Sequence, residues 1–239
     1  YRMIFSWFLT KMVDKYVAVQ EETKKIMREM YGITKKIEFI PLGTDEHIFR
    51  FDKRSRVFIR KKYKIPTLDF VIIYTGKIIP SKGIEILFRS FNLLCKKHKD
   101  FWLILVGDGT EEYKDECLSL LEEEFRSKIV WTGFQENNNL YQYYSIADVA
   151  VWPLQESTGM NDAASCGLPF IANDTIGTQV RISNNNALLY RKSDSKDLAD
   201  KIEILYKNPK LRKKMGIKGR ELVEEKLSWN KISQRYLTF

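Results

Sequence analysis

Short uninterrupted apolar runs alternate with segments of helical periodicity through most of this 239-residue chain. Residues 70–74 and 101–106 are such runs, and each predicts a strand that is buried on both faces. Between them, the spacing of an amphipathic helix recurs in Ile84, Leu87, Phe88, Phe91, Leu94 and Cys95. Strands that alternate with helices of this length favour right-handed crossovers. The sequence therefore predicts an α/β protein with a doubly wound, Rossmann-like parallel sheet.

The same alternation extends on both sides of this unit. Further strands are predicted at residues 14–19, 37–40, 129–132, 149–152, 170–172 and 188–190, and helices at residues 21–31, 111–125, 140–145, 160–166, 195–206 and 209–226. Residues 50–64 carry many basic side chains and little apolar pattern. We predict a linker and a domain boundary there, with residues 51–227 forming the main domain.

Charge and composition narrow the class of protein. The formal net charge of +9 suits phosphate-bearing or other anionic partners. An apolar share of 44% argues against a disordered chain, and no apolar run approaches the ~18 residues of a spanning helix. Cys95, Cys117 and Cys166 are an odd number without a Cys-x-x-Cys pair, so neither a disulfide framework nor a zinc ribbon is supported. We expect a reducing compartment and a cytoplasmic location.

Ligands of a doubly wound sheet bind beyond the carboxyl ends of its strands, so the residues after each strand are the first candidates for a site. The run at residues 70–74 is followed by a loop that begins with Gly76-Lys77 and ends with Lys82-Gly83, before a helix. Ammonium groups and helix N-terminal amides both hold phosphates. The loop therefore predicts a phosphate site, and two solvated lysines are the alternative.

Two further glycine turns follow predicted strands. Gly107-Asp108-Gly109 resembles the start of a dinucleotide fingerprint but lacks the third glycine, so a tight turn is favoured. After the next strand, the backbone around Gly133-Phe134 could meet a flat ring, and a plain turn is the equal alternative.

The most informative loop follows the strand at residues 149–152. An exposed carboxylate, Glu156, precedes a turn whose free amides would open a helix, formed by Ser157, Thr158, Gly159, Met160 and Asn161. The helix then carries a second carboxylate, Asp162. Amides at a helix start can take a diphosphate, and two acids can accept hydrogen bonds from sugar hydroxyls. In the alternative, Asp162 only caps or solvates a short helix.

Taken in order, these motifs resemble the retaining nucleotide-sugar glycosyltransferases of family 4, a part of the group 1 glycosyl transferases with the two-domain GT-B fold. The residues that carry the resemblance are the loop from Gly76 to Gly83, Gly107-Asp108-Gly109, Gly133-Phe134, Ala147-Asp148-Val149 with Pro153, and Glu156 through Gly167-Leu168-Pro169. Two departures stand out. Lys77 replaces the family's arginine and lacks its bidentate fork. The family's Glu-x7-Glu motif is two residues shorter here, with Asp162 in place of the second glutamate.

The resemblance implies a role for each motif in binding a nucleotide-diphosphate sugar. Lys77 and Lys82 would hold the diphosphate, Asp162 the ribose, and Glu156 the hexose hydroxyls. The other implied donor contacts are Gly76, Phe134, Ser157, Thr158, Gly159, Met160 and Asn161. Lys77, Lys82 and Glu156 would form the catalytic group. Transfer with retention, without a metal or other cofactor, would deliver the sugar to a glycan or a lipid-linked acceptor.

In this family the acceptor-binding half precedes the donor-binding half. We therefore expect residues 1–50 to be the remnant of an acceptor domain with its crossover, and residues 228–239 to begin a helix that returns to it. A chain of this extent would bind the donor and transfer little. The start of the chain predicts either a core helix of that lost domain or a peripheral helix on a membrane surface, through Met3, Ile4, Phe5, Trp7, Phe8, Leu9, Met12 and Val13.

Three other functions remain open at this point. A nucleic-acid-binding module would use the positive charge, but the basic residues are spread among acidic ones and no binding motif is present, so we expect no nucleic-acid partner. A nucleotide-sugar epimerase shares the GT-B architecture, and epimer formation without an acceptor would reveal it. A non-catalytic nucleotide-binding module would account for the shortened motif.

Overall fold

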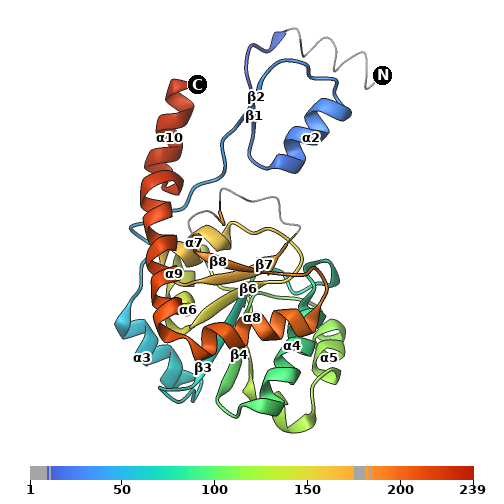
Figure 1. Cartoon of the computed structure of the whole chain (residues 1–239), viewed down its shortest axis with the longest axis vertical. Coiled ribbons are helices and arrows are strands. Elements are labelled where there is room, and N and C mark those ends of the chain that lie inside the picture. Colours follow the sequence, from blue (N-terminus) through green and yellow to red (C-terminus); the bar gives the residue numbers. More distant parts are fainter. Residues whose placement is uncertain (1–9, 11, 175–180, 183–184) are drawn as a thin grey trace.

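The computed structural model describes residues 10, 12–174, 181–182 and 185–239. Its centre is a parallel sheet of six strands in the order β5-β4-β3-β6-β7-β8 (Figure 1). The strands are β3 (Phe70–Thr75), β4 (Phe101–Val106), β5 (Ile129–Trp131), β6 (Val149–Trp152), β7 (Phe170–Asn173) and β8 (Ala187–Tyr190). The predicted α/β fold with a doubly wound parallel sheet is confirmed.

The chain winds outward from the middle of this sheet in two directions. β3 pairs with β4 along its whole length, with Phe70 opposite Phe101, and β5 follows on that side. β6 pairs with the other edge of β3, and β7 and β8 lie beyond it. The strand order therefore reverses between β3 and β6. This reversal is the topological switch point, beyond which such sheets bind their ligands.

Helices cover both faces of the sheet (Figure 1). They are α3 (Lys53–Lys62), α4 (Ile84–Lys97), α5 (Glu111–Ser119), α6 (Leu140–Ile146), α7 (Gly159–Ser165), α8 (Ser195–Lys207) and α9 (Pro209–Leu222). α4 packs against α5 and α8, while α6 packs against α3 and α7. All residues of β3 and β4 are buried between these layers, which explains their continuous apolar sequence. α5 ends earlier than the predicted residue 125, and a 3-10 turn, Glu123–Lys128, follows it.

Helix α3 corrects the prediction of a linker over residues 50–64. The carboxylate of Asp52 accepts hydrogen bonds from the amides of Arg54 and Ser55, which caps the start of the helix. Ile59 and Arg60 are buried where α3 packs on α6. The sequence pattern did not predict this helix because its buried face contains the charged side chain of Arg60 and no continuous apolar stripe.

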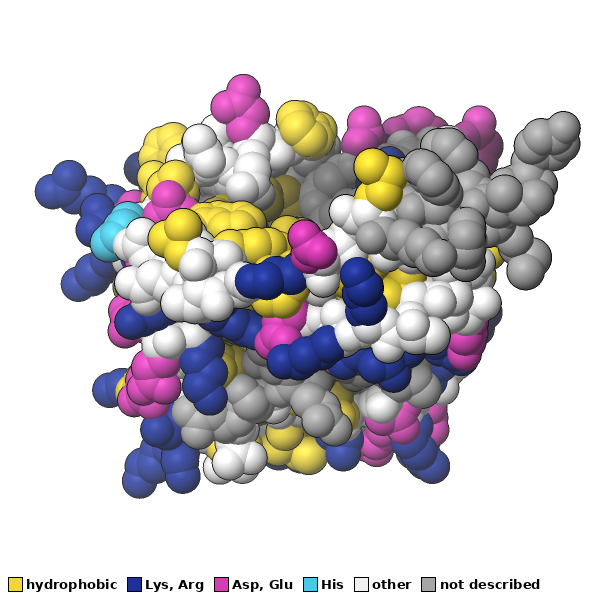
Figure 2. All heavy atoms as spheres, turned by 90° about the horizontal axis from the view of Figure 1, so that it is seen from above, with side chains coloured by type: hydrophobic (Ala, Val, Ile, Leu, Met, Phe, Trp, Pro, Cys, Tyr) yellow, Lys and Arg dark blue, Asp and Glu magenta, His cyan; other side chains and the backbone are white. Residues whose placement is uncertain are grey.

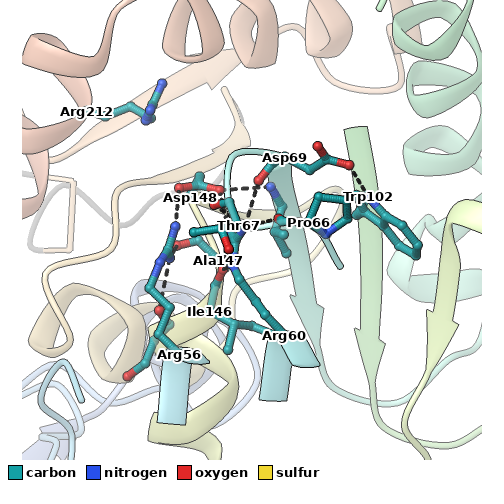
Figure 3. A network of polar contacts seen from close by, with 12 residues as sticks. Arg56, Arg60, Pro66, Thr67, Asp69, Trp102, Ile146, Ala147, Asp148 and Arg212 are labelled. Atoms are coloured by element: carbon teal, nitrogen blue, oxygen red, sulfur yellow. Dashed lines mark hydrogen bonds and ion pairs between the residues drawn. The ribbon is translucent and has the colours of Figure 1, made fainter. Parts of the chain in front are cut away.

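A polar network fastens α3 to the sheet (Figure 3). Arg60 Nη2 lies 3.0 Å from Asp148 Oδ2, and Arg56 Nη2 lies 3.1 Å from Asp148 Oδ1. The amide of Val71 in β3 donates to Asp148 Oδ2 at 2.9 Å. Asp148, which stands in the Ala-Asp-Val motif before β6, therefore joins α3, β3 and β6.

A second, smaller sheet lies apart from the first. It pairs β1 (Tyr16–Ala18) with β2 (Ile37–Phe39) in parallel, and α2 (Glu21–Glu29) connects the two strands. The last helix, α10 (Trp229–Thr238), reaches this sheet, and its Arg235 donates a hydrogen bond to the carbonyl of Phe39. In Figure 1 the small sheet and the end of α10 lie at one end of the molecule, and α3 lies at the other. Figure 2 views the molecule from the first of these ends. The division at residues 50 and 227 stays a prediction.

The structure bears on the expectations for the start of the chain, for a membrane-spanning helix and for the cysteines. Most of the apolar segment at the start of the chain lies outside the described residues, and within them Met12 and Val13 are exposed. Among the described helices, none has the length and apolar character required to cross a membrane. Cys95, Cys117 and Cys166 are buried and free.

Candidate functional site

Two adjoining cavities open at the switch point of the sheet. The first, called here the inner cavity, has a volume of about 540 Å³, and its lining includes Gly76, Lys77, Phe134, Thr158, Gly159 and Asp162. The second, called the lysine cavity, has a volume of about 420 Å³, and its lining includes Gly76, Lys77, Lys82, Gln155 and Ser157. Gly76, Lys77 and Ser157 border both. The structure thus brings most of the predicted site residues to one crevice.

Glycines let the loops around this crevice approach each other closely. A Cβ atom on Gly107 would lie 1.9 Å from the carbonyl oxygen of Gly76, and the φ of Gly107 is 146°. The amide of Gly107 donates to the carbonyl of Gly133, and that of Ile78 donates to the carbonyl of Asp108. The Gly-Asp-Gly motif is therefore a turn that joins the loops after β3, β4 and β5.

The two lysines of the first loop lie beside the cavity mouth. Lys77 is exposed and Lys82 is half-buried. Within the described ranges, neither ammonium group has an ion pair. Burial and, second, the charge of Lys77 lower the pKa of Lys82. Two neighbouring cations that lack a carboxylate partner form a site to which an anion can bind with little rearrangement.

Glu156 is paired with a residue that the sequence did not point to. Arg181 Nη1 lies 2.7 Å from Glu156 Oε1, and only 4% of the Arg181 side chain is exposed. Burial raises the pKa of Glu156, while the charge of Arg181 opposes that shift. Glu156 borders neither of the two cavities, although the next residue, Ser157, borders both.

Asp162 is the buried carboxylate of the inner cavity. Its Oδ1 accepts a hydrogen bond of 2.5 Å from the hydroxyl of Thr44, which lies in the crossover from the small sheet. Burial raises the pKa of Asp162 to about 6, while the Thr44 hydrogen bond and the charge of Arg181 act in the opposite direction. The side chain is therefore an ionised acceptor at neutral pH, although it is 6% exposed.

The amides at the start of α7 are not free, which corrects one prediction. The amide of Gly159 donates to Ser157 Oγ, that of Met160 to the carbonyl of Ser157, and that of Asn161 to the carbonyl of Thr158. The side chain of Met160 is fully buried, and the side-chain amide of Asn161 donates to the carbonyl of Leu42. The amides of these three residues are therefore occupied, and the lysines are the charged donors that border the crevice.

Phe134 forms the outer rim of the inner cavity. Its side chain is 76% exposed, and Gly133 before it has a φ of 68°. The loop therefore presents an open aromatic ring and its backbone to the cavity, in the place where the sequence predicts contact with a flat ring.

Thr44 and Arg181 are the polar residues that sequence reasoning missed. Thr44 is 118 residues from the carboxylate it contacts, and a single sequence holds no signal for such a pairing. Arg181 follows β7, so the rule that points to residues after each strand could have found it. No group of three or more metal-ligating side chains occurs in the part of the chain that the structure describes.

A prediction tests the buried state of Asp162. Asp162→Asn keeps an acceptor for Thr44 but is never charged. Burial raises the pKa of the Asp162 carboxyl from 3.8 to about 6, so the folded state favours the protonated form. The stability that this protonated carboxyl contributes to the fold is fully present below pH 3.8 and is lost as the pH rises through 6. The variant should therefore exceed the parent in free energy of unfolding by about 2–3 kcal/mol at about pH 7.5, and show no gain near pH 4.

Urea unfolding at the two pH values measures this difference. Asp194→Asn is the matched control of opposite sign, because hydrogen bonds from the α8 amides lower the pKa of Asp194, and its loss should reduce stability at neutral pH. A gain for Asp162→Asn that is equal at both pH values would contradict the raised pKa.

The fold and the crevice define a class: an α/β protein with a lysine-bordered crevice at the switch point of a doubly wound sheet. The family model described as "Glycosyl transferases group 1" matches residues 55–222. The chain belongs to this family, and its fold is that of one half of the GT-B glycosyltransferases.

Individual relatives agree with this assignment. The chain is 26% identical to the capsular polysaccharide biosynthesis glycosyltransferase CapM of Staphylococcus aureus, over 98% of this chain and 66% of the relative. It is 24% identical to a GDP-mannose-dependent monoacylated alpha-(1-6)-phosphatidylinositol monomannoside mannosyltransferase of Corynebacterium glutamicum, over 93% of this chain and 61% of the relative. The crystal structure of Anabaena HepE in complex with UDP shares the fold. The TM-score is 0.83 at 16% identity, over 94% of this chain and 62% of the HepE chain. The chain thus spans less than two thirds of the length of these relatives.

Proposed function

We propose that this chain forms the donor-binding half of a retaining glycosyltransferase, which transfers a hexose from a nucleotide-diphosphate sugar to a glycan or lipid-linked acceptor. The observation that carries the proposal is a pair of lysines, without carboxylate partners among the described residues, at a crevice that the buried Asp162 also lines. Family membership and the names of the relatives, which include capsular polysaccharide and phosphatidylinositol mannoside synthesis, support the substrate classes.

In the proposed complex the diphosphate lies between Lys77 and Lys82. The bond from the anomeric carbon to the phosphate oxygen breaks and its electron pair stays on the diphosphate. The acceptor hydroxyl oxygen bonds to the same face of the sugar, and its proton passes to the departing diphosphate. Negative charge grows on the leaving diphosphate in the transition state. Ammonium groups that are already in place stabilise this charge without reorganising, which is where most of the rate enhancement arises.

Asp162 and the Phe134 loop, which line the inner cavity, provide further proposed donor contacts. Asp162 accepts hydrogen bonds from the ribose, and the Phe134 loop contacts the base. The role of Glu156 in binding the hexose hydroxyls rests on the family motif, because Glu156 borders neither cavity, and Arg181 holds its carboxylate in one orientation. Because the α7 amides are occupied, Lys82 and Lys77 carry more of the phosphate charge than the motif implied. We propose that transfer needs no metal, since the lysines supply positive charge where a divalent cation otherwise would.

Thermal unfolding of this chain with nucleotides tests the proposal. UDP, GDP or ADP, whichever the site accepts, should raise the melting temperature by about 5–10 °C at a hundredfold excess over its Kd, because only the folded state binds it. The matching nucleosides are the control, and they should produce a much smaller rise because they lack the diphosphate. No rise with any of the three diphosphates, or an equal rise with a nucleoside, would contradict the lysine site.

A further inference from the structure

Helix α3 exposes an apolar face in the middle of a basic segment. Val57 and Phe58 are 64% and 67% exposed. Arg54 and Lys61 stand three residues before Val57 and three after Phe58, so the i, i+3, i+4, i+7 spacing places these four side chains on one side of the helix. The opposite side holds Ile59 and Arg60, which are buried against the domain. The crevice does not involve this face.

The charges around this face are unbalanced. The exposed cations within and beside α3 are Arg50, Lys53, Arg54, Lys61, Lys62 and Lys64. None of them forms an ion pair with a described residue, whereas Arg56 and Arg60 turn inward to Asp148. Asp52 is the one acidic residue among residues 50–64, and its carboxylate caps the start of α3. The hydrogen bonds from Ser55 lower the pKa of this carboxylate. The surface therefore attracts anions around an apolar centre.

Three kinds of partner could cover such a face, and the charges discriminate among them. A second copy of this chain, related by a two-fold axis, would bring Arg54 and Lys61 against their own equivalents, and like charges repel. A nucleic acid would neutralise the cations but would leave the aliphatic Val57 without a partner. A lipid surface with anionic headgroups can bind both the apolar pair and the cations of this face. The apolar side chains enter the boundary of the acyl chains, while the cations remain at the headgroups.

We propose that the face of α3 formed by Arg54, Val57, Phe58 and Lys61 binds an anionic lipid surface. This face lies at the end of the molecule away from the small sheet (Figure 1). It is distinct from the apolar segment at the start of the chain, to which the sequence first pointed. The binding is independent of the donor site, so loss of nucleotide binding and loss of lipid binding are separate results.

Co-sedimentation of this chain with vesicles tests the proposal. Vesicles of equal parts phosphatidylcholine and phosphatidylglycerol should bind the chain, and vesicles of phosphatidylcholine alone should not. Binding should weaken as salt is added, because the cations are at the surface. Phe58→Asp should reduce the partition coefficient at least about tenfold, and Lys61→Ala should reduce it about fivefold.

Matched controls come from other exposed positions. Leu237→Asp changes an 86% exposed leucine in α10, and Lys210→Ala removes an exposed lysine from α9, so neither should alter vesicle binding. Unchanged melting temperatures show that each variant is folded. Equal binding to both kinds of vesicle, or undiminished binding of Phe58→Asp, would overturn the proposal. Binding to RNA or DNA without binding to vesicles would overturn it as well.

Discussion

Replacing Arg60 by methionine is expected to lower the free energy of unfolding by about 3–5 kcal/mol. The side chain is 4% exposed, and its guanidinium is the central donor of the network in Figure 3. Besides the ion pair with Asp148, it donates to the carbonyl oxygens of Ile146, Pro66, Thr67 and Asp69. Methionine fills a similar volume but donates no hydrogen bond. The variant would leave the buried carbonyl oxygen of Ile146 and the half-buried carboxylate of Asp148 without this donor.

The neighbouring residue provides the control for this prediction. Lys61 is in the same helix, is exposed and has no ion pair with a described residue, so Lys61→Met should change stability by less than about 0.5 kcal/mol. Urea unfolding followed by circular dichroism gives both values. Because Asp148 also holds the amide of Val71, the loss should be accompanied by a lower midpoint of the whole domain and not by local melting of α3 alone. A loss for Arg60→Met as small as that for Lys61→Met would contradict the network's importance.

The contrast between Arg60 and the strands shows where sequence reasoning succeeds. β3 and β4 were predictable because a strand covered on both faces needs apolar residues at every position, and few other structures need that pattern. The buried face of α4 was predictable for the same kind of reason, since its apolar spacing is regular. α3 was not, because its anchor is a cation paired with a carboxylate 88 residues away, and no periodicity marks such a pair.

Some residues of the crevice were likewise predictable from the sequence, and others were not. Lys77, Lys82 and Asp162 could be placed near each other because each follows a strand that ends at the same edge of the sheet. The free amides of the α7 turn were a wrong expectation, because the bonds that occupy them depend on the turn's own geometry. The partners of the two carboxylates, Thr44 and Arg181, come from segments outside the motifs.

Replacing Lys82 by alanine is expected to have the largest effect on the proposed function. In a polypeptide that also contains the acceptor-binding half, transfer should fall by about 10²–10³, mainly in kcat, because the charge on the leaving diphosphate is greatest in the transition state. Nucleotide diphosphate affinity of this chain should fall by about tenfold to a hundredfold, since a charge-assisted hydrogen bond is lost. Initial rates of nucleotide diphosphate release with acceptor, and melting-temperature shifts, measure the two effects.

The position of Lys82 explains why it should matter more than Lys77. Both residues line the lysine cavity, but Lys82 is half-buried and Lys77 is exposed, so the field of Lys82 is screened less by water. Lys77→Ala should therefore produce a smaller loss of kcat. Lys210→Ala, at an exposed position that borders neither cavity, should produce no loss. Lys82→Arg keeps the charge and should restore part of the rate. Unchanged transfer by Lys82→Ala would remove the phosphate role from this loop, even if the nucleotide still binds through Asp162 and the Phe134 rim.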